Sequence, residues 1–95
     1  MTNILPPVHP GEILREEYLH PLGMSAGALA RLVDVPRTRI ERLASEQTAV
    51  TPSTALRLAK VFDTTPEFWM NLQATYDLTV EAEREAPALA KIHAL

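Results

Sequence analysis

Three arginines lie within six residues of one another, at Arg37, Arg39 and Arg42. A guanidinium group donates paired hydrogen bonds to phosphate oxygens or to the edge of guanine, so an exposed arginine cluster is typical of a nucleic-acid-binding surface. The chain as a whole has the opposite charge. Its formal net charge is -3, and residues 63–95 contain six acids but only two cations. We therefore expect any contact with nucleic acid to be confined to the arginine cluster.

Other side chains that could do chemistry lack the partners that the chemistry requires. The chain has no cysteine, which excludes disulfides and cysteine metal sites. His9, His20 and His93 do not show the spacing of metal ligands. Ser25 has no recognisable base or oxyanion loop, and the three glycines do not form a phosphate-binding loop. We expect a protein that is not an enzyme and that binds no metal or cofactor.

The spacing of two short helical segments places the arginines on the second helix of a helix-turn-helix. Ser25 is a candidate N-cap of the first helix, and Pro36 is expected to open the second. Only the residues DV and this proline separate the two segments, which is the spacing of a helix-turn-helix. Asp34 lies at the turn, where a left-handed backbone is often needed. Ile40 and Leu43 are expected to face inward on the second helix.

The outer face of that second helix is predicted to carry Arg37, Thr38, Glu41 and Arg42. In a helix-turn-helix the N-terminal part of this helix enters the major groove of DNA. Arg37 and Arg42 are then candidate base readers together with Thr38, whereas Arg39 points about 100° away from its neighbours and is predicted to bind a phosphate. Glu41 either accepts a hydrogen bond from cytosine or forms a salt bridge within the helix. From spacing alone, a solvated arginine face on an ordinary helical bundle remains an alternative.

Prolines divide the rest of the chain into further helical segments, and no alternating pattern of β-branched residues predicts a strand. One helix is expected over about Pro10–Leu19 and another over Pro52–Phe62. A third is expected from Pro66 past Tyr76, with an extension into residues 79–85 left open. Threonines precede two of these prolines and are expected to cap the helices.

Pro87 is expected to interrupt the last of these helices, so that residues 88–95 form a short helix of their own. The prediction is an all-α bundle of five to six helices in a single domain over residues 1–95, with its core at about residues 9–80. The other residues expected to be buried are Ile13, Leu14, Ala28, Leu29, Leu32, Val33, Ala55, Leu56, Ala59 and Phe62.

The N-terminal residues MTNILPPVHPGE lack a charged start followed by a long apolar stretch, so they do not resemble a secretory signal. No apolar run approaches the length of about 20 residues that a membrane-spanning helix needs. We therefore expect a cytoplasmic protein without a membrane partner.

Two stretches, HPGEILREEYLHPLG and ALRLAKVFDTTPEFWMNLQATYDL, flank the helix-turn-helix. With it they resemble the HigA/VapI antitoxins of the Cro/cI-like (XRE) helix-turn-helix class, over about residues 9–80. The resemblance implies a lambda repressor-like fold and a homodimer that represses its own operon at a palindromic operator. It also implies a partner toxin, HigB, similar to the RelE-type mRNA endonucleases. The DNA-binding residues that it implies are Ser25, Arg37, Thr38, Arg39 and Arg42.

Two positions depart from the pattern of that family. Members often have a glutamine just after the position of Ser25, where this chain has Ala26 and Gly27. Members also often have a basic turn after the second helix, where this chain has SEQT with Glu46. Both changes remove expected phosphate contacts, for which the three arginines compensate. The alternatives are an orphan transcriptional regulator without a toxin, and a toxin-binding protein with weakened DNA binding.

The C-terminal segment, about residues 66–95, is expected to form the homodimer interface, because a core of this size is marginal and one helix can direct only some of its apolar residues inward. Toxin binding is predicted to use the N-terminal segment through the first helix, or the acidic tail, and not the arginine helix. The residues predicted for dimerisation are Phe68, Trp69, Leu72, Tyr76 and Leu78, with Val80 beside them.

Overall fold

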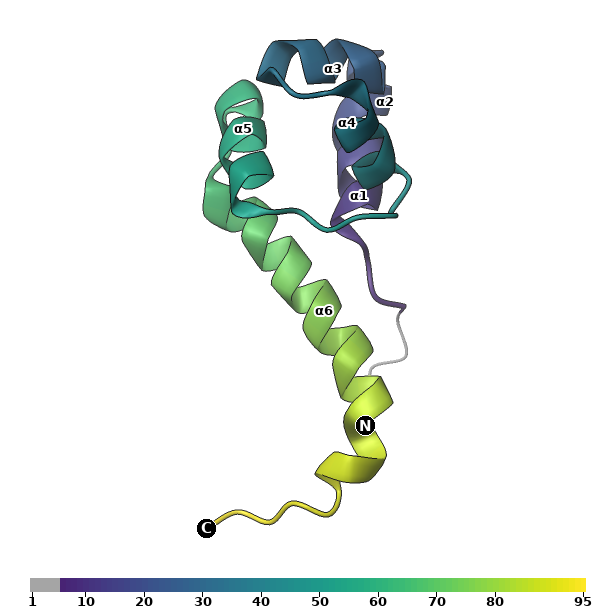
Figure 1. The fold of residues 1–95 in the computed structure, drawn as a ribbon, viewed down its shortest axis with the longest axis vertical. Coiled ribbons are helices and arrows are strands. Elements are labelled where there is room, and N and C mark those ends of the chain that lie inside the picture. Colours follow the sequence, from purple (N-terminus) through teal and green to yellow (C-terminus); the bar gives the residue numbers. More distant parts are fainter. Residues whose placement is uncertain (1–5) are drawn as a thin grey trace.

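The computed structural model describes residues 6–95, and all the regular structure in this part of the chain is helical (Figure 1). The all-α prediction is confirmed. A globular body is built from the N-terminal helices and α5, and a long C-terminal helix extends away from it. The elements in chain order are α1 (Pro10–Ile13), the π-helix η1 (Leu14–Leu19), α2 (His20–Leu22), α3 (Ala26–Val33), α4 (Arg37–Ala44), α5 (Pro52–Phe62) and α6 (Pro66–Leu89).

The segments α1, η1 and α2 follow one another without a break and form one helical rod, three residues longer than expected. His9 caps its start, because the imidazole Nδ1 accepts a hydrogen bond from the Gly11 N–H at 2.9 Å. The rod ends at Gly23, which has a left-handed backbone with φ of 59°. Glycine adopts this conformation without a steric penalty, which explains why the chain turns there.

Side-chain caps start three of the other helices as predicted. Ser25, Thr51 and Thr65 each accept a hydrogen bond from the backbone N–H three residues further on. Such caps pair N–H groups that have no partner inside the helix. Pro36 occupies the N-cap position of α4 with an extended backbone, so α4 begins one residue later than expected.

The core confirms most of the expected buried residues but corrects two leucines. Leu32 and Leu56 were expected to face inward, yet their exposed fractions are 61% and 60%. Val33 is buried as expected, and Leu58, which was not expected in the core, is fully buried. Ile13, Ala28 and Phe62 are only half-buried. The fully buried large side chains are Leu14, Leu29, Ile40, Leu43, Leu58 and Trp69.

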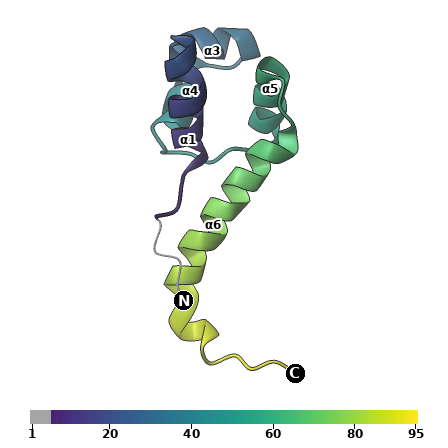
Figure 2. The ribbon, with the colours of Figure 1, turned by 180° about the vertical axis from the view of Figure 1, so that it is seen from behind.

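Helix α6 meets the globular body near its own start and then runs away from it (Figure 2). Trp69, in the first turn of α6, joins this helix to the core. Its indole is fully buried, its Nε1 donates to the Thr64 hydroxyl at 2.8 Å, and its ring packs against Tyr18 and Phe62 with centroid separations of 5.3 and 6.3 Å. A side chain held in this way has no surface left for a second chain. We therefore place Trp69 in the core and correct its predicted role in dimerisation.

Helix α6 continues through Pro87, so the predicted interruption and the separate helix over residues 88–95 are wrong. A proline removes the hydrogen bond to the carbonyl four residues earlier, here that of Glu83, and its ring crowds the same carbonyl. Residues 81–95 are exposed, so water can bind this carbonyl in the last turns of the helix. The projecting helix gives the molecule a longest dimension of 50 Å. No helix in the described part of the chain has the length and apolar character needed to cross a membrane.

Candidate nucleic-acid interface

The turn between α3 and α4 has the backbone that the sequence predicts. Asp34 has φ of 58° and ψ of 55°, and the Val35 N–H bonds the Ala30 carbonyl at 3.1 Å, which closes the end of α3. Arg57 from α5 donates from Nη1 to the carbonyl oxygens of Val33 and Asp34. The orientation of α3 relative to α4 is therefore fixed from both sides of the turn.

Helix α4 buries Ile40 and Leu43 and exposes all three arginines, as predicted. The arginines divide differently from the prediction, however. Arg37 lies on one side of the helix, where its Nε faces the Glu41 carboxylate at 3.5 Å. Arg39 and Arg42 lie on the other side, where both line a shallow groove of about 430 Å³.

Hydroxyl groups supply much of the rest of that groove, which runs between α4 and the start of α5. Its lining includes Thr38 on α4, Thr48 in the loop, and Thr51 and Ser53 at the start of α5. Hydroxyls and guanidinium groups are the side chains that contact phosphate oxygens and base edges in DNA complexes. The structure thus brings Thr38, Arg39 and Arg42 together and sets Arg37 apart, while the role of each remains a prediction.

Ser25 is the N-cap of α3, the first helix of the helix-turn-helix. Its Oγ accepts the hydrogen bond from the Ala28 N–H at 3.1 Å. A serine hydroxyl that accepts one bond still has a proton to donate, and this side chain is exposed. The predicted contact with a phosphate is therefore compatible with its role as a cap.

Arg15 holds the far end of α4, a role that the sequence did not reveal. Its Nη1 donates to the Ala44 carbonyl, its Nη2 faces Glu46 at 3.2 Å, and its Nε faces Glu16 at 2.9 Å. Hydrogen bonds to Glu16 and then Glu46 raise the pKa of Arg15, and the bond from Arg15 lowers the pKa of Glu16. Glu46, which departs from a basic family position, thus has a structural partner. No local pattern predicts this contact, because 29 residues separate Arg15 from Ala44.

Gly11 determines how closely the first helix approaches α4. A Cβ atom at Gly11 would overlap the Leu43 carbonyl oxygen, so only glycine allows this packing. His9 is buried next to it and stacks edge-on against Tyr76 of α6 with ring centroids 4.9 Å apart. The HPG sequence therefore ties α1, α4 and α6 together.

A buried glutamine holds the loop that follows α4. Gln73 accepts a hydrogen bond from the Val50 N–H at 2.7 Å and donates to Asp77 at 2.9 Å. These two bonds satisfy a polar side chain in the core and fix the loop that leads into α5. Nothing in the sequence distinguishes this glutamine from an exposed one.

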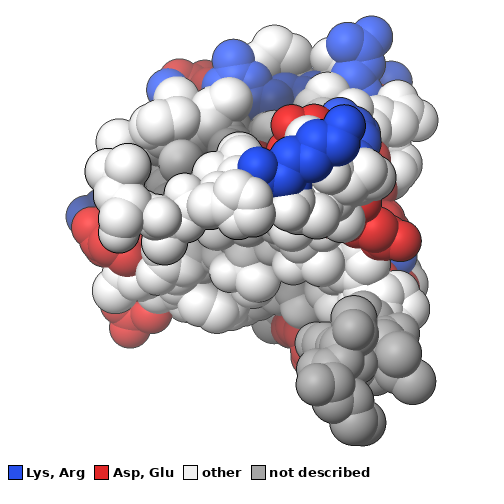
Figure 3. All heavy atoms as spheres, turned by 90° about the horizontal axis from the view of Figure 1, so that it is seen from below, with Lys and Arg blue, Asp and Glu red and all other residues white. Residues whose placement is uncertain are grey.

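Charge is sparse on the face seen from the C-terminal end of the molecule. Figure 3 shows that most of this face is uncharged, that lysine and arginine atoms gather mainly along its upper edge, and that acidic atoms lie towards the sides. Within the described residues, no three histidine or acidic side chains are grouped closely enough to hold a metal ion. The candidate site on α4 consists of arginine and hydroxyl side chains.

Residues 14–69 match the helix-turn-helix family HTH_3, which is 56 of the 95 residues. The chain belongs to the HTH_3 helix-turn-helix family. The match begins at Leu14 in the first helical rod and ends at the buried Trp69, so it includes the complete helix-turn-helix and the core that supports it.

The HTH_3 relatives confirm the predicted resemblance to the HigA/VapI group. Virulence-associated protein I of Dichelobacter nodosus is 46% identical over 87 residues, which cover 92% of this chain and 80% of the relative. Antitoxin HigA-1 of Vibrio cholerae is 39% identical over 72 residues, 76% of this chain and 68% of the relative. The solved structure of Pseudomonas aeruginosa antitoxin HigA with the higBA promoter is similar with a TM-score of 0.90 and 38% identity, over 94% and 98% of the two chains.

Proposed function

We propose that this protein is the antitoxin of a HigBA-like type II toxin–antitoxin system. In this role it is a homodimer that represses its own operon and also binds and neutralises a RelE-like mRNA endonuclease toxin. It acts in the cytoplasm, where both the operator and the toxin's ribosomal substrate are found. The antitoxin itself carries out no reaction.

The exposed side chains of α4 carry this proposal. Arg39 and Arg42 make no ion pair with another described residue. Arg15 and Arg57, by contrast, support the fold through hydrogen bonds to backbone carbonyl groups. Two unpaired arginines on the second helix of a helix-turn-helix are available for DNA. The Pseudomonas aeruginosa HigA, whose structure resembles this chain, was solved with its promoter.

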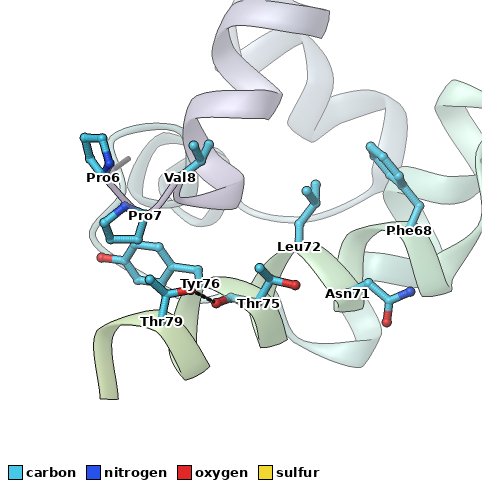
Figure 4. Close-up of a pocket in the computed structure, with 9 residues that line it drawn as sticks. All are labelled: Pro6, Pro7, Val8, Phe68, Asn71, Leu72, Thr75, Tyr76 and Thr79. Atoms are coloured by element: carbon cyan, nitrogen blue, oxygen red, sulfur yellow. Dashed lines mark hydrogen bonds between the residues drawn. The ribbon is translucent and has the colours of Figure 1, made fainter. Parts of the chain in front are cut away.

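The homodimer is proposed to form through the face of α6 that the body of the molecule leaves uncovered. A shallow groove of about 440 Å³ runs along this helix beside the N-terminal segment at residues 6–8 (Figure 4). Phe68, Leu72 and Tyr76 line it. Leu78 follows Tyr76 by two residues, so it lies outside this groove on another side of α6, where 71% of its surface is exposed. Apolar groups that one helix leaves uncovered indicate a protein interface. Two-fold symmetry would place two α4 helices on successive turns of DNA.

Toxin binding is proposed to leave α4 free and to use the acidic end of α6 or the N-terminal segment through α1. Residues 81–95 are exposed and carry Glu81, Glu83 and Glu85. Only Arg84 offsets them within the helix, where it pairs with Glu81 at 2.9 Å. This charge suits a basic partner protein.

A gel shift of the purified protein on its own promoter, with and without the product of the neighbouring gene, tests the proposal. We expect a retarded band with the protein alone and a further shift with a small basic partner. Operator binding without such a partner would instead support the orphan regulator. Toxin neutralisation without operator binding would support a protein whose DNA surface is weakened.

A further inference from the structure

We propose that Gly27, Arg31 and Arg37 form a binding site for a backbone phosphate of DNA at the start of α3. The inference rests on the proposed DNA-binding function and deepens it. Gly27 and Arg31 join the interface, and Arg37 becomes a phosphate contact and not a base reader. Gly27 then determines DNA affinity because it has no side chain.

Gly27 provides the space through which the Arg37 side chain passes. A Cβ atom built on Gly27 would lie 3.1 Å from Cδ and 3.6 Å from Cγ of Arg37. Non-bonded carbon atoms pack best at about 3.5–4.0 Å, so the stem of Arg37 lies directly against the backbone of α3. A Cβ atom alone would push the Arg37 side chain aside by a few tenths of an ångström, and a large side chain such as leucine would displace it further.

Arg31 reaches the same point from within α3. It follows Gly27 by four residues and therefore lies on the same face of the helix. Its Nη1 would be 3.9 Å from the same Cβ atom. Because Arg37 Cδ is 3.1 Å from that atom, these two arginine atoms are at most 7.0 Å apart. Two arginines thus converge over one glycine, although they belong to different helices.

Both guanidinium groups have donors to spare. Arg31 has no carboxylate within ion-pair distance among the described residues, and Arg37 uses only Nε towards Glu41. A phosphate oxygen accepts hydrogen bonds from several donors, and charged pairs of this kind are strong. The exposed Ser25 hydroxyl lies at the same end of α3.

This arrangement gives a reason for the departure at Ala26 and Gly27. The glutamine that clamps the DNA backbone is absent here, and a large side chain at position 27 would crowd Arg37. The two arginines supply the phosphate contact in place of the glutamine. The absence of the glutamine and the presence of Gly27 thus have one explanation, which is that the two arginines bind the phosphate here.

The test compares Gly27→Leu, Arg31→Ala and Arg37→Ala with the wild type on operator and random duplex DNA at several salt concentrations. Each variant should weaken binding roughly tenfold on both DNAs, since a phosphate contact carries no sequence information. The slope of log K against log salt should become less steep by about 1 per protomer. Arg84→Ala, which removes an exposed arginine on α6, should change neither quantity.

Thermal unfolding and a combined variant separate a lost contact from a damaged fold. Leucine is a better helix former than glycine, so Gly27→Leu should unfold at the same temperature as the wild type or higher. Adding Gly27→Leu to the Arg31→Ala, Arg37→Ala double variant should weaken binding no further.

Wild-type affinity and salt slope in Gly27→Leu and Arg31→Ala would overturn the site while leaving the proposed function intact. A loss on the operator alone would also overturn it, because Arg37 would then read a base. A wild-type protein that binds neither DNA would overturn both this inference and the proposed operator binding.

Discussion

Arginines serve two separate purposes in this chain, and their contacts distinguish them. Arg15 and Arg57 donate to carbonyl groups at the ends of α4 and α3, so they belong to the fold. Arg39 and Arg42 face a groove lined by hydroxyl groups and form no ion pair with the described residues. Counting basic residues would therefore overstate the charge available to DNA.

Arg42→Ala and Arg39→Ala should weaken DNA binding in different ways. Arg42 is the predicted base reader, so its loss should cost about 1–3 kcal/mol on the operator and relax the preference at one base pair. Arg39 is the predicted phosphate contact, so its loss should weaken operator and random DNA alike. Titrations of both variants on both DNAs check this, and two variants that bind the operator like the wild type would show that the cluster is only a solvated face.

Glu41→Gln should strengthen binding to every DNA sequence. The carboxylate of Glu41 faces Arg37 at 3.5 Å on an exposed surface, where it offsets one positive charge and repels nearby phosphates. Because exposed charge interactions are worth up to about 1 kcal/mol, we expect a gain of about two- to fivefold in affinity. Filter binding with operator and random DNA measures it. A loss confined to the operator would mean that Glu41 accepts a hydrogen bond from cytosine.

At the scale of the elements, α4 depends on contacts that hold its C-terminal end. Arg15 binds its last carbonyl, and Gly11 allows the first helix to approach Leu43. The loop after α4 is held by the hydrogen bond from the Val50 N–H to Gln73. The arginine-bearing surface of α4 is thus positioned by residues that lie outside it.

Gly11→Ala should destabilise the protein although alanine is the better helix former. The added Cβ overlaps the Leu43 carbonyl oxygen, so α1 must move away from α4. Overpacking of this kind costs about 1–3 kcal/mol, which urea denaturation detects as a lower midpoint. Glu12→Ala, an exposed change in the same turn, is the control and should keep the wild-type midpoint. Equal midpoints for both variants would show that α1 adjusts without cost.

The sequence predicts helix starts better than it predicts which residues are buried. Ser25, Thr51 and Thr65 cap their helices as expected, because a cap is a local interaction between residues three apart. Leu32 and Leu56 were assigned to the core in error. A helix of 8 or 11 residues with leucine or valine on more than one side offers more than one possible inward face, and only the packing partner decides which face is buried.

The sequence predicts which helix carries the arginines of the candidate site, but not how these side chains group in space. The turn and the proline place the arginines on α4, and the structure agrees. The separation of Arg37 from Arg39 and Arg42 depends on Gly27 and on the groove beside α5, which lie elsewhere in the sequence. Contacts between distant segments carry no periodic signal, so they become visible only in the folded chain.

For the molecule as a whole, a substitution on the outer surface of α6 should separate dimerisation from folding. We expect Leu78→Glu to be monomeric at micromolar concentration, whereas the wild type sediments as a dimer, because the change puts a charge into the proposed interface. Leu78 is exposed in the single chain, so the thermal unfolding of the monomer itself should be unaffected. Leu32→Glu, an equally exposed change on α3, should remain dimeric. A monomeric wild type, also on DNA, would refute the dimer.

The projecting end of α6 has a consequence for the lifetime of the protein. Residues 81–95 are exposed and pack against no buried residue, so in the single chain this end opens at little cost in free energy. Proteases cleave segments that open locally, and this one is separated from the buried residues around Trp69 and Gln73. Degradation would therefore begin here and remove the acidic residues first, while the helix-turn-helix stayed folded. A bound partner that covered this end would slow the degradation of the chain. The lifetime of the chain would then depend on the fraction of it that is bound to the partner.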